Sequence, residues 1–340
     1  MVKQSAAGIQ PQMAMPIHWG ARPVRNFPNP NQDMTAADND CIELKEEIKP
    51  LGKPRKQRQK KTVNNCNIFM FQEFMLNGVE SGNPPAYTDM TCLSDGRVVI
   101  VVYGNNRSSL YDSSYHYMSD FKLSSGPCGI CTVDTDEVAV VLPTESKVTF
   151  LKIVDTILPI GQITTRRKCT SVAALSKMEL VYAGTTSKES SYYWGVITRD
   201  GQEKTCFHIP RGKIERANVY IALNSSNTRV YISCCDVRTV YCLGLDGVFH
   251  FEYKVKKGNG QGFPLVIRLD TENNVYVVDK HLNIIHCLWP DGKLQQIFKD
   301  GIPRKPSAMC LQQSCDRFLL LGKDKKDANV CCIYKLKTKK

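Results

Sequence analysis

The stretch Gln261–Phe298, QGFPLVIRLDTENNVYVVDKHLNIIHCLWPDGKLQQIF, decides the fold that this chain is expected to adopt. Four runs typical of β-strands follow one another in it, at Val266–Leu269, Val275–Val278, Ile284–Trp289 and Lys293–Phe298. Asp291-Gly292 predicts a tight hairpin connection before the last run, because both residues tolerate a positive φ. Four short antiparallel strands make one small sheet, and its apolar face would remain in water unless similar sheets packed against it.

Similar units recur along the chain. Each places an apolar anchor residue at the end of a predicted inner strand, directly before a polar or turn-like break. The six anchors are Leu93, Val133, Leu175, Leu223, Leu269 and Leu311, at steps of 40 to 48 residues. A period of this length with four strands per unit is typical of a β-propeller.

We therefore predict an all-β fold, a six-bladed β-propeller at residues 63–340, preceded by a disordered tail at 1–62 that is rich in Pro, Gln and Asn. The blades are expected at 89–126, 127–165, 168–210, 217–259, 261–302 and 304–340. The last unit is one strand short, while the strand candidate Asn67–Leu76 lies outside all six repeats. We expect residues 67–76 to complete the last blade, because ring closure removes exposed sheet edges.

The chain has 340 residues, 42% of them apolar, and a formal net charge of +12. Most of the excess lies in Lys53–Lys61 and Gly322–Lys340, so the propeller itself is expected to be nearly neutral. Such charge clusters are usually solvated tails, and contacts with nucleic acid or nuclear import through Lys53–Lys61 are the alternatives.

The 15 cysteines include several within apolar β runs, where cysteine behaves as a small buried hydrophobic residue. The first residues contain no apolar segment of signal-peptide length, and no run approaches the length of a membrane span. These observations predict a cytoplasmic monomer with free thiols and no membrane contact.

The unit at 261–302 resembles an NHL repeat. The matching elements are Pro264, Asp270, Asn274 with Val275–Val278, Asp279, Asn283 with Ile284-Ile285, and Asp291-Gly292. Ile284 stands where the family has a His after the Asn. The unit at 217–259 matches in part, through Asp236, Val240 and Asp246-Gly247, and the other four are degenerate.

The whole is similar to the C-terminal propeller of tripartite-motif proteins, of the divergent invertebrate type. That resemblance implies a propeller that binds partners, either protein or RNA. Those proteins carry a RING, a B-box and a coiled coil upstream. Here only His18 and Cys41 lie in the first 62 residues, so no zinc cross-brace is expected there and ubiquitin-ligase activity is not implied.

Several predicted loops between one blade and the next are basic. Their basic residues are Arg166, Arg167, Lys168, Arg211, Lys213, Arg216, Lys256, Lys257, Arg304 and Lys305. Such loops gather on one face of a propeller, where they would attract phosphates or an acidic peptide. Tyr220 and Phe263 lie nearby as platforms on which bases could stack. The alternative is an ordinary solvated loop surface.

No catalytic residue, cofactor or metal site is predicted. Cys128 and Cys131 have the spacing of a redox or zinc pair, but no second pair supplies the remaining zinc ligands. A hydrolase or lactonase centred on the channel would need several carboxylates on the inner strands, and these runs are mostly apolar. The leading hypothesis is a non-catalytic protein-interaction module, and the alternatives are RNA binding by the basic face and a channel-centred hydrolase.

Overall fold

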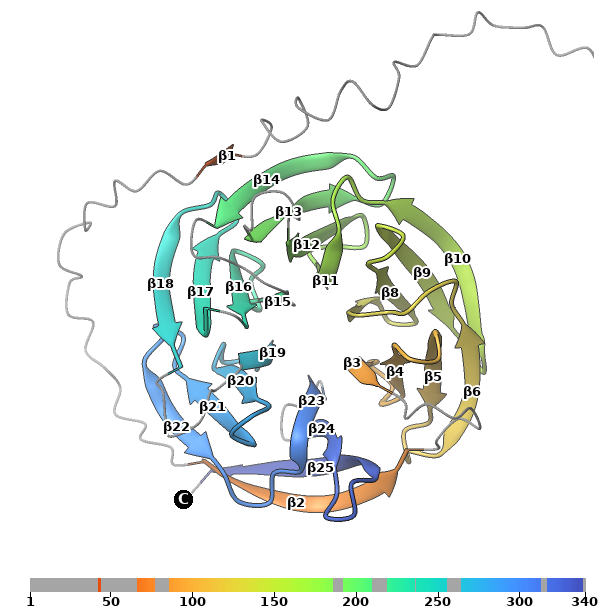
Figure 1. Cartoon of the computed structure of the whole chain (residues 1–340), viewed down its shortest axis with the longest axis vertical. Coiled ribbons are helices and arrows are strands. Elements are labelled where there is room, and N and C mark those ends of the chain that lie inside the picture. The colour runs from red at the N-terminus through yellow and green to blue at the C-terminus, as the bar shows by residue number, and fades with distance from the viewer. Residues whose placement is uncertain are drawn as a thin grey trace, which may run out of the picture. The chain divides into compact units, whose positions relative to one another are not determined.

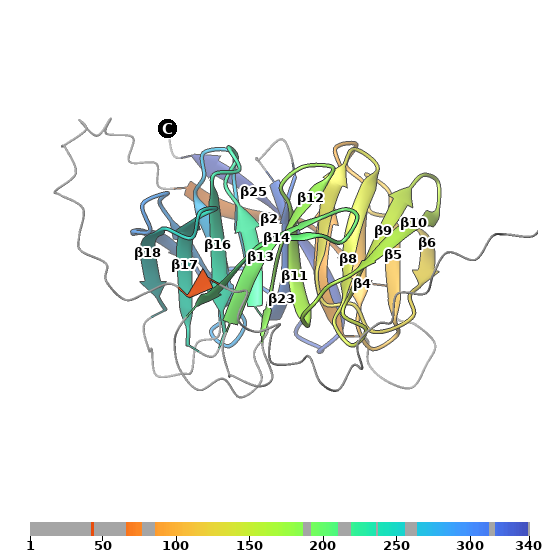
Figure 2. The ribbon, with the colours of Figure 1, turned by 90° about the horizontal axis from the view of Figure 1, so that it is seen from above.

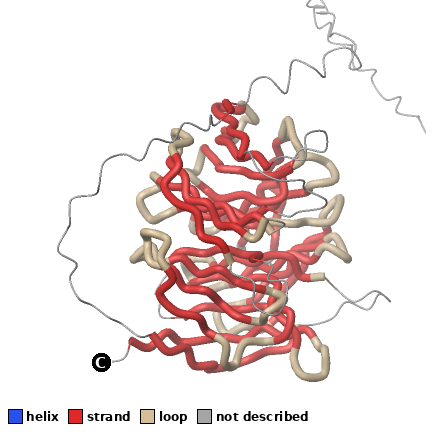
Figure 3. The backbone as a smooth tube through the Cα atoms, turned by 60° about the vertical axis from the view of Figure 1, so that its left-hand side comes forward, coloured by secondary structure: helices blue, strands red, loops and turns tan. Residues whose placement is uncertain are grey.

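In the computed structural model, the described residues are 42–43, 66–76, 86–185, 192–209, 219–235, 237–255, 264–312 and 317–338. The chain divides into two units, 1–40 and 41–340, and all described residues belong to the second. They form strands, turns and loops, with no helix among them (Figure 3). Accordingly, no described helix could cross a membrane. The predicted tail at 1–62, including Lys53–Lys61, lies outside the described residues except for Ile42–Glu43.

Six sheets surround a central axis, and the first strand of each blade lies innermost (Figure 1). Blade 1 consists of β3 (Tyr87–Cys92), β4 (Val98–Val102), β5 (Arg107–Tyr111) and β6 (Tyr117–Lys122). Blade 2 consists of β7 (Ile130–Asp134), β8 (Glu137–Leu142), β9 (Lys147–Ile153) and β10 (Ile157–Thr164). Blade 3 consists of β11 (Cys169–Ala174), β12 (Glu179–Thr185), β13 (Tyr192–Thr198) and β14 (Glu203–Ile209).

The other three blades repeat this arrangement. Blade 4 consists of β15 (Val219–Leu223), β16 (Arg229–Cys234), β17 (Thr239–Gly244) and β18 (Phe249–Lys254). Blade 5 consists of β19 (Pro264–Leu269), β20 (Val275–Asp279), β21 (Ile284–Leu288) and β22 (Leu294–Phe298). Blade 6 consists of β23 (Arg304–Leu311), β24 (Arg317–Lys323), β25 (Asn329–Thr338) and β2 (Cys66–Met75). The prediction of a six-bladed β-propeller is confirmed.

Strand sequences follow from position within a blade. The second strands, such as β4 with VVIVV, are mostly apolar and are buried except at the ends of some of them, because neighbouring blades cover both faces of the sheet. The outermost strands β6, β10 and β22 are largely exposed or half-buried, and they carry more polar residues. The apolar side chains between blades form the core.

The two ends of the propeller meet in blade 6, as predicted. β2 pairs antiparallel with β25, with Phe69 opposite Lys335 and Met75 opposite Val330. The register shifts at Phe71, which forms a bulge between Met70 and Gln72. The ring is therefore closed by hydrogen bonds between strands from opposite ends of the sequence.

The C-terminal charge cluster Gly322–Lys340 is not a solvated tail over most of its length. Asn329–Thr338 is β25, which pairs with β24 on one side and β2 on the other. The residues before it make the turn between β24 and β25, in which Asp324 Oδ1 accepts hydrogen bonds from the backbone N–H of Lys326 and Ala328. The blade predicted at 304–340 includes this segment, so its charges lie on a strand and a turn, and the general interpretation of charge clusters as solvated tails does not apply to it.

The Asp291-Gly292 turn joins β21 to β22, although it is longer than a two-residue connection. The Gly292 N–H donates to Trp289 O at 2.9 Å, and only Gly292 has a positive φ, of 82°. Pro290 occupies the second position of the turn, where its fixed φ favours this geometry. A Cβ on Gly292 would collide with the ring of Phe251, so glycine is also required for the approach of blade 4.

Asparagines with a left-handed backbone tie neighbouring blades together. Asn227, Asn273 and Asn283 have φ of 52°, 62° and 52°. Asn227 Nδ2 donates to Leu175 O, the Ser225 N–H donates to Asn273 Oδ1, and the Lys305 N–H donates to Asn283 Oδ1, at 2.7 to 2.9 Å. Asparagine suits these turns because it tolerates this conformation and its amide reaches the next blade.

Two further features concern the outer edge and the thiols. Ile42–Glu43 forms β1, which pairs in parallel with β14 at the edge of blade 3. Cys206 of β14 is disulfide-bonded. The expectation of free thiols is wrong for Cys206, whereas Cys92 and Cys310 are among the cysteines that are free.

Phe74 of β2 is expected to stabilise the packing of β2 against blade 1. Its ring stacks on Tyr115 with centroids 5.4 Å apart and also contacts Tyr111 at 5.5 Å. Phe74→Ala is expected to lower the free energy of unfolding by about 2–3 kcal/mol, because a half-buried aromatic contact is lost. Phe71→Ala on the same strand, where the ring is 53% exposed, is the matched control and should cost less than about 1 kcal/mol. Equal losses in urea denaturation would contradict this role for Phe74.

Candidate functional site

The propeller has two faces that differ in which loops they carry. Loops that lead from one blade to the next lie beside the turns between second and third strands. The Leu123 N–H donates to Asn106 O at 2.6 Å, and the Thr165 N–H donates to Ser146 O at 2.7 Å. We call this side the interblade-loop face. The turns between first and second strands and between third and fourth strands form the opposite side, the hairpin face (Figure 2).

Four of the predicted basic residues are exposed on the interblade-loop face. Arg166 and Lys168 lie between blades 2 and 3, and Arg304 and Lys305 lie between blades 5 and 6. The two pairs occupy different parts of the ring. Arg211, Lys213, Arg216, Lys256 and Lys257 lie outside the described residues.

Arg167 has a different environment from its neighbours. Its side chain is 8% exposed, and its Nη1 lies 3.1 Å from Glu203 Oε1. Its guanidinium carbon lies 5.7 Å from the centre of the Tyr193 ring, and the hydroxyl of Tyr182 donates to Glu203. Arg167 therefore belongs to a buried polar group between blades 2 and 3, and we remove it from the set of surface residues.

The structure adds two residues of the β24–β25 turn to the basic residues at the start of blade 6. Lys325 and Lys326 are exposed in the β24–β25 turn. Asp327 of the same turn lies 3.8 Å from Lys305 Nζ, which places this turn beside the start of β23. We call Arg304, Lys305, Lys325 and Lys326 the blade 5–6 cluster. Lys325 and Lys326 were not predicted as binding residues because they lie in a turn within blade 6 and not in a loop between blades.

Of the two aromatic platforms proposed for base stacking, Tyr220 does not occupy this surface. Tyr220 is 6% exposed, because it packs within the core at the start of β15. Phe263 lies outside the described residues. Tyr103, in the β4–β5 turn of the same face, is 44% exposed.

Acidic residues dominate the turns of the hairpin face. Exposed or half-buried carboxylates there are Asp95, Asp112, Asp136, Asp155, Asp200, Asp246, Glu272 and Asp291. Basic residues of this face pair with such acids, as in Arg97 with Asp95 and Lys293 with Asp291, both at 2.6 Å. The turns of the hairpin face are thus mainly acidic, whereas the interblade-loop face exposes the basic residues named above.

A layer of equivalent residues surrounds the axis one position before the six anchors. Its members are Cys92, Thr132, Ala174, Ala222, Arg268 and Cys310. Thr132 contacts blade 1 through its hydroxyl, 2.7 Å from that of Thr91. Cys92 Sγ and Cys310 Sγ are 2.7 Å apart. Arg268 is the single charged member of the layer.

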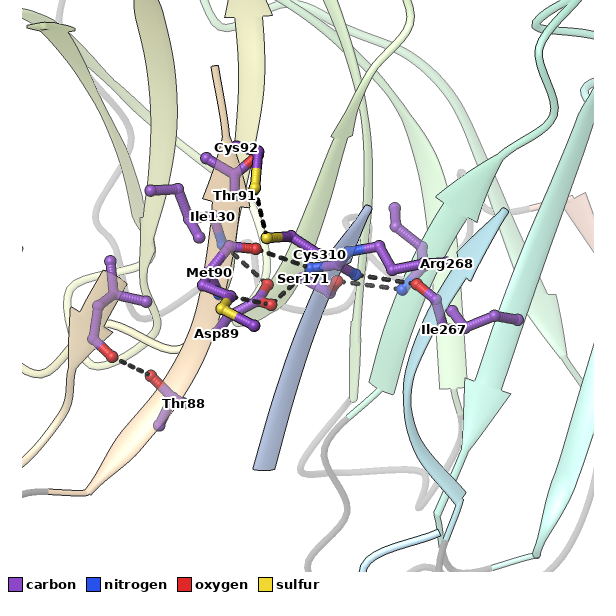
Figure 4. A network of polar contacts seen from close by, with 12 residues as sticks. Thr88, Asp89, Met90, Thr91, Cys92, Ile130, Ser171, Ile267, Arg268 and Cys310 are labelled. Carbon is purple, nitrogen blue, oxygen red and sulfur yellow. Dashed lines mark hydrogen bonds and ion pairs between the residues drawn. The ribbon is translucent and has the colours of Figure 1, made fainter. Parts of the chain in front are cut away.

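Arg268 forms an ion pair with Asp89 of blade 1 (Figure 4). Its Nη2 lies 2.5 Å from Asp89 Oδ1 and its Nη1 donates to Ile267 O at 2.9 Å. Asp89 Oδ1 also accepts from the Met90 N–H, and Oδ2 accepts from the Ile130 N–H at 3.2 Å. Both oxygens of this buried carboxylate are engaged, and the group joins the inner strands of blades 1, 2 and 5.

The ionisation of this site is governed by burial. Burial raises the pKa of Asp89 above its usual value, and Arg268 with the two backbone N–H groups opposes that rise without cancelling it. Arg268 within LVIRL was the available sequence signal, because it is a lone charge inside an otherwise apolar inner run. Its partner could not be read from the sequence.

Cys128 and Cys131 are placed as structural thiols. Burial raises the pKa of Cys128 to about 11 and that of Cys131 to about 12, which disfavours the thiolate needed for redox or metal chemistry. Within the described part of the chain, no group of three or more His, Cys, Asp or Glu side chains is arranged to hold a metal ion.

Comparison with known proteins defines the class of fold. The structure is similar to hydrazine synthase of Kuenenia stuttgartiensis, with a TM-score of 0.56 and 9% identity over 78% of this chain and 99% of that one. It is also similar to virginiamycin B lyase from Staphylococcus aureus, with a TM-score of 0.54 and 14% identity over 79% of this chain and 99% of that one. At such identities the likeness concerns the fold alone.

No family model matches the sequence, and no curated protein matches it. The chain is therefore a six-bladed β-propeller by its structure. The NHL repeat and the tripartite-motif proteins remain resemblances carried by the residues of blade 5.

Removing Arg268 should expose the cost of burying Asp89. Arg268→Met is expected to lower the free energy of unfolding by about 3–5 kcal/mol at pH 7, because it leaves an unpaired buried carboxylate. The folded-state pKa of Asp89 is already raised and will rise further. The loss of unfolding free energy caused by Arg268→Met is therefore largest at pH values above the folded-state pKa of Asp89. It disappears below the unfolded-state pKa of about 4.

The deficit relative to wild type should accordingly shrink as the pH is lowered from 7 towards 4 in urea denaturation. Asp89→Asn/Arg268→Met is the control, since it removes both charges and should show no such pH dependence. A deficit for Arg268→Met that stays constant across this range would show that the lost packing of the arginine stem, and not the carboxylate, is responsible.

Proposed function

We propose that this propeller is a non-catalytic binding module that recruits a partner protein through an acidic segment docked on the interblade-loop face. The observation that carries the proposal is the exposure of basic side chains from separate loops on one face, while the opposite face is acidic. Such a distribution orients an anionic partner towards one side and repels it from the other.

The blade 5–6 cluster is the centre of the proposed surface. The backbone of Lys305 is fixed by its hydrogen bond to Asn283 Oδ1 at 2.7 Å. Its ammonium lies 3.8 Å from Asp327, and both side chains are more than half exposed. An exposed pair at this distance contributes little, so a carboxylate-rich peptide could replace Asp327 at small cost. Arg304 adds a planar group suited to bidentate contact with a carboxylate.

An acidic peptide is favoured over RNA as the ligand. Sequence-tolerant binding of single-stranded RNA combines basic grooves with exposed aromatic rings on which bases stack. Tyr220, which was expected to supply such a ring, is 6% exposed, and the exposed ring of Tyr103 lies in blade 1, outside the blade 5–6 cluster. RNA remains the alternative outcome of the experiment.

A binding role is also favoured over a channel-centred hydrolase. On the described parts of the inner strands the carboxylates are Asp89 and Asp134. Asp89 is held by Arg268 and two backbone N–H groups, and Asp134 pairs with Lys177 at 2.5 Å. Neither arrangement leaves a converging set of carboxylates for a metal or for general acid–base chemistry.

The finer assignment is to NHL-type propellers, on the basis of blade 5. There Asp270 accepts hydrogen bonds from Asn274 and from the Tyr276 hydroxyl, and Asp279 Oδ1 accepts from the backbone of His281 and Leu282. The motif residues thus build the turns of the blade. We extend the proposal to a cytoplasmic monomer without a cofactor.

The binding proposal can be measured by fluorescence anisotropy with a labelled Glu/Ser-repeat peptide and, separately, a labelled oligouridine. Arg304→Glu/Lys305→Glu is expected to weaken peptide binding about tenfold or more, since a loss of about 1.4 kcal/mol suffices for that factor. Arg166→Glu/Lys168→Glu tests the second group in the same way. Binding should also weaken as salt is raised.

Lys177→Glu/Lys293→Glu is the matched control, because it makes the same change of charge at exposed lysines of the hairpin face, 68% and 72% exposed. It should leave the affinity within about twofold. Peptide binding that is unaffected by either interblade pair would refute the proposed surface. Tighter binding of oligouridine than of peptide, lost in the same variants, would replace the protein partner by RNA.

A further inference from the structure

Cys92 and Cys310 occupy the same position in two repeats of the propeller. Each directly precedes an anchor residue, in TCLSDG of β3 and in MCLQQS of β23. The two residues are 218 positions apart in sequence, yet their sulfur atoms are 2.7 Å apart. They meet because β3 is the first inner strand of the ring and β23 is the last (Figure 4).

The two thiols have unequal surroundings. Cys92 is 9% exposed, whereas Cys310 is 3% exposed. Burial, with the contact to Cys92, raises the pKa of Cys310 well above its ordinary value, and Cys310 in turn contributes to the raised pKa of Cys331. Both sulfurs are free in the structure.

We propose that Cys92 and Cys310 form a modification site, at which a hydroperoxide oxidises the pair to a reversible disulfide across the junction of blades 1 and 6. An S–S bond is about 2.05 Å long, so the sulfurs need to approach by only about 0.7 Å. Inner strands in separate sheets can accommodate such a shift more readily than two positions within one hydrogen-bonded ladder.

The reaction proceeds in two balanced steps. The more exposed Cys92 sulfur attacks the peroxide, the O–O bond breaks, and Cys92 becomes a sulfenic acid while the other oxygen leaves as water or alcohol. Cys310 sulfur then attacks Cys92 sulfur, the S–OH bond breaks, and water leaves with the Cys310 proton. Each sulfur has lost one electron, and the peroxide has accepted two.

Burial slows the oxidation of this pair and gives the two cysteines different roles in it. The high pKa of Cys310 keeps it as a thiol in the resting protein, so Cys310 is suited to the second step and not to the first. The proximity of its sulfur compensates for the small thiolate fraction, because capture of the sulfenic acid needs no diffusion. The product links two inner strands that share no ladder hydrogen bond.

Peptide mapping of the full-length protein by mass spectrometry, after treatment with hydrogen peroxide and alkylation without reductant, tests the proposal. The expected result is a cross-linked pair of peptides containing Cys92 and Cys310, which disappears after dithiothreitol. Finding Cys310 joined instead to Cys331, or both cysteines alkylated under conditions that oxidise other thiols, would overturn it. This measurement needs no variant and so does not depend on a substitution being tolerated.

Variants separate this site from general oxidation. Cys92→Ser and Cys310→Ser should each abolish the cross-link, whereas Cys169→Ser, which removes a buried cysteine of inner strand β11, should leave it unchanged. Oxidised wild type is expected to melt about 5 °C higher than reduced wild type, with no shift in Cys92→Ser. A cross-link that persists in Cys92→Ser would refute the assignment.

Discussion

The hydrogen bonds between β2 and β25 are the constraint on which the rest of the propeller depends. Each blade has two apolar faces, and each face is buried by a neighbour, so the first and last blades must meet for the ring to have no wet face. β2 completes blade 6 and, through Phe74, contacts Tyr111 and Tyr115 of blade 1. The buried second strands of every blade are possible only because this junction exists.

The channel depends on the same junction. Once the inner strands form a closed ring, one equivalent residue from each repeat reaches the same level around the axis. The other five members of that layer are small and neutral, and Arg268 therefore has room to extend to Asp89. The ion pair forms because blade 5 has a charged residue, Arg268, at a position where the other blades have small neutral residues. The neighbouring thiols of Cys92 and Cys310 meet because they occupy this same position in blades 1 and 6.

Local patterns predicted the fold well. The anchors, the turn residues and the spare strand at 67–76 are all short-range features, and together they gave the blade number and the closure. Sequence could not give long-range polar pairings, such as Asp89 with Arg268, which are 179 residues apart. It also could not distinguish Arg167, buried against Glu203, from the exposed residues beside it, because the three have the same local composition.

Ring closure through β2 has a consequence for biosynthesis. During translation β2 leaves the ribosome before any blade has formed, and β25, the strand that it needs, emerges only after the first five blades. Until then a segment containing Phe69, Phe71 and Phe74 has no ladder partner, and the final blade cannot be completed. Such a nascent chain would depend on shielding of this segment by chaperones or on slow late assembly, so the emergence of β25 decides when the segment is protected from aggregation.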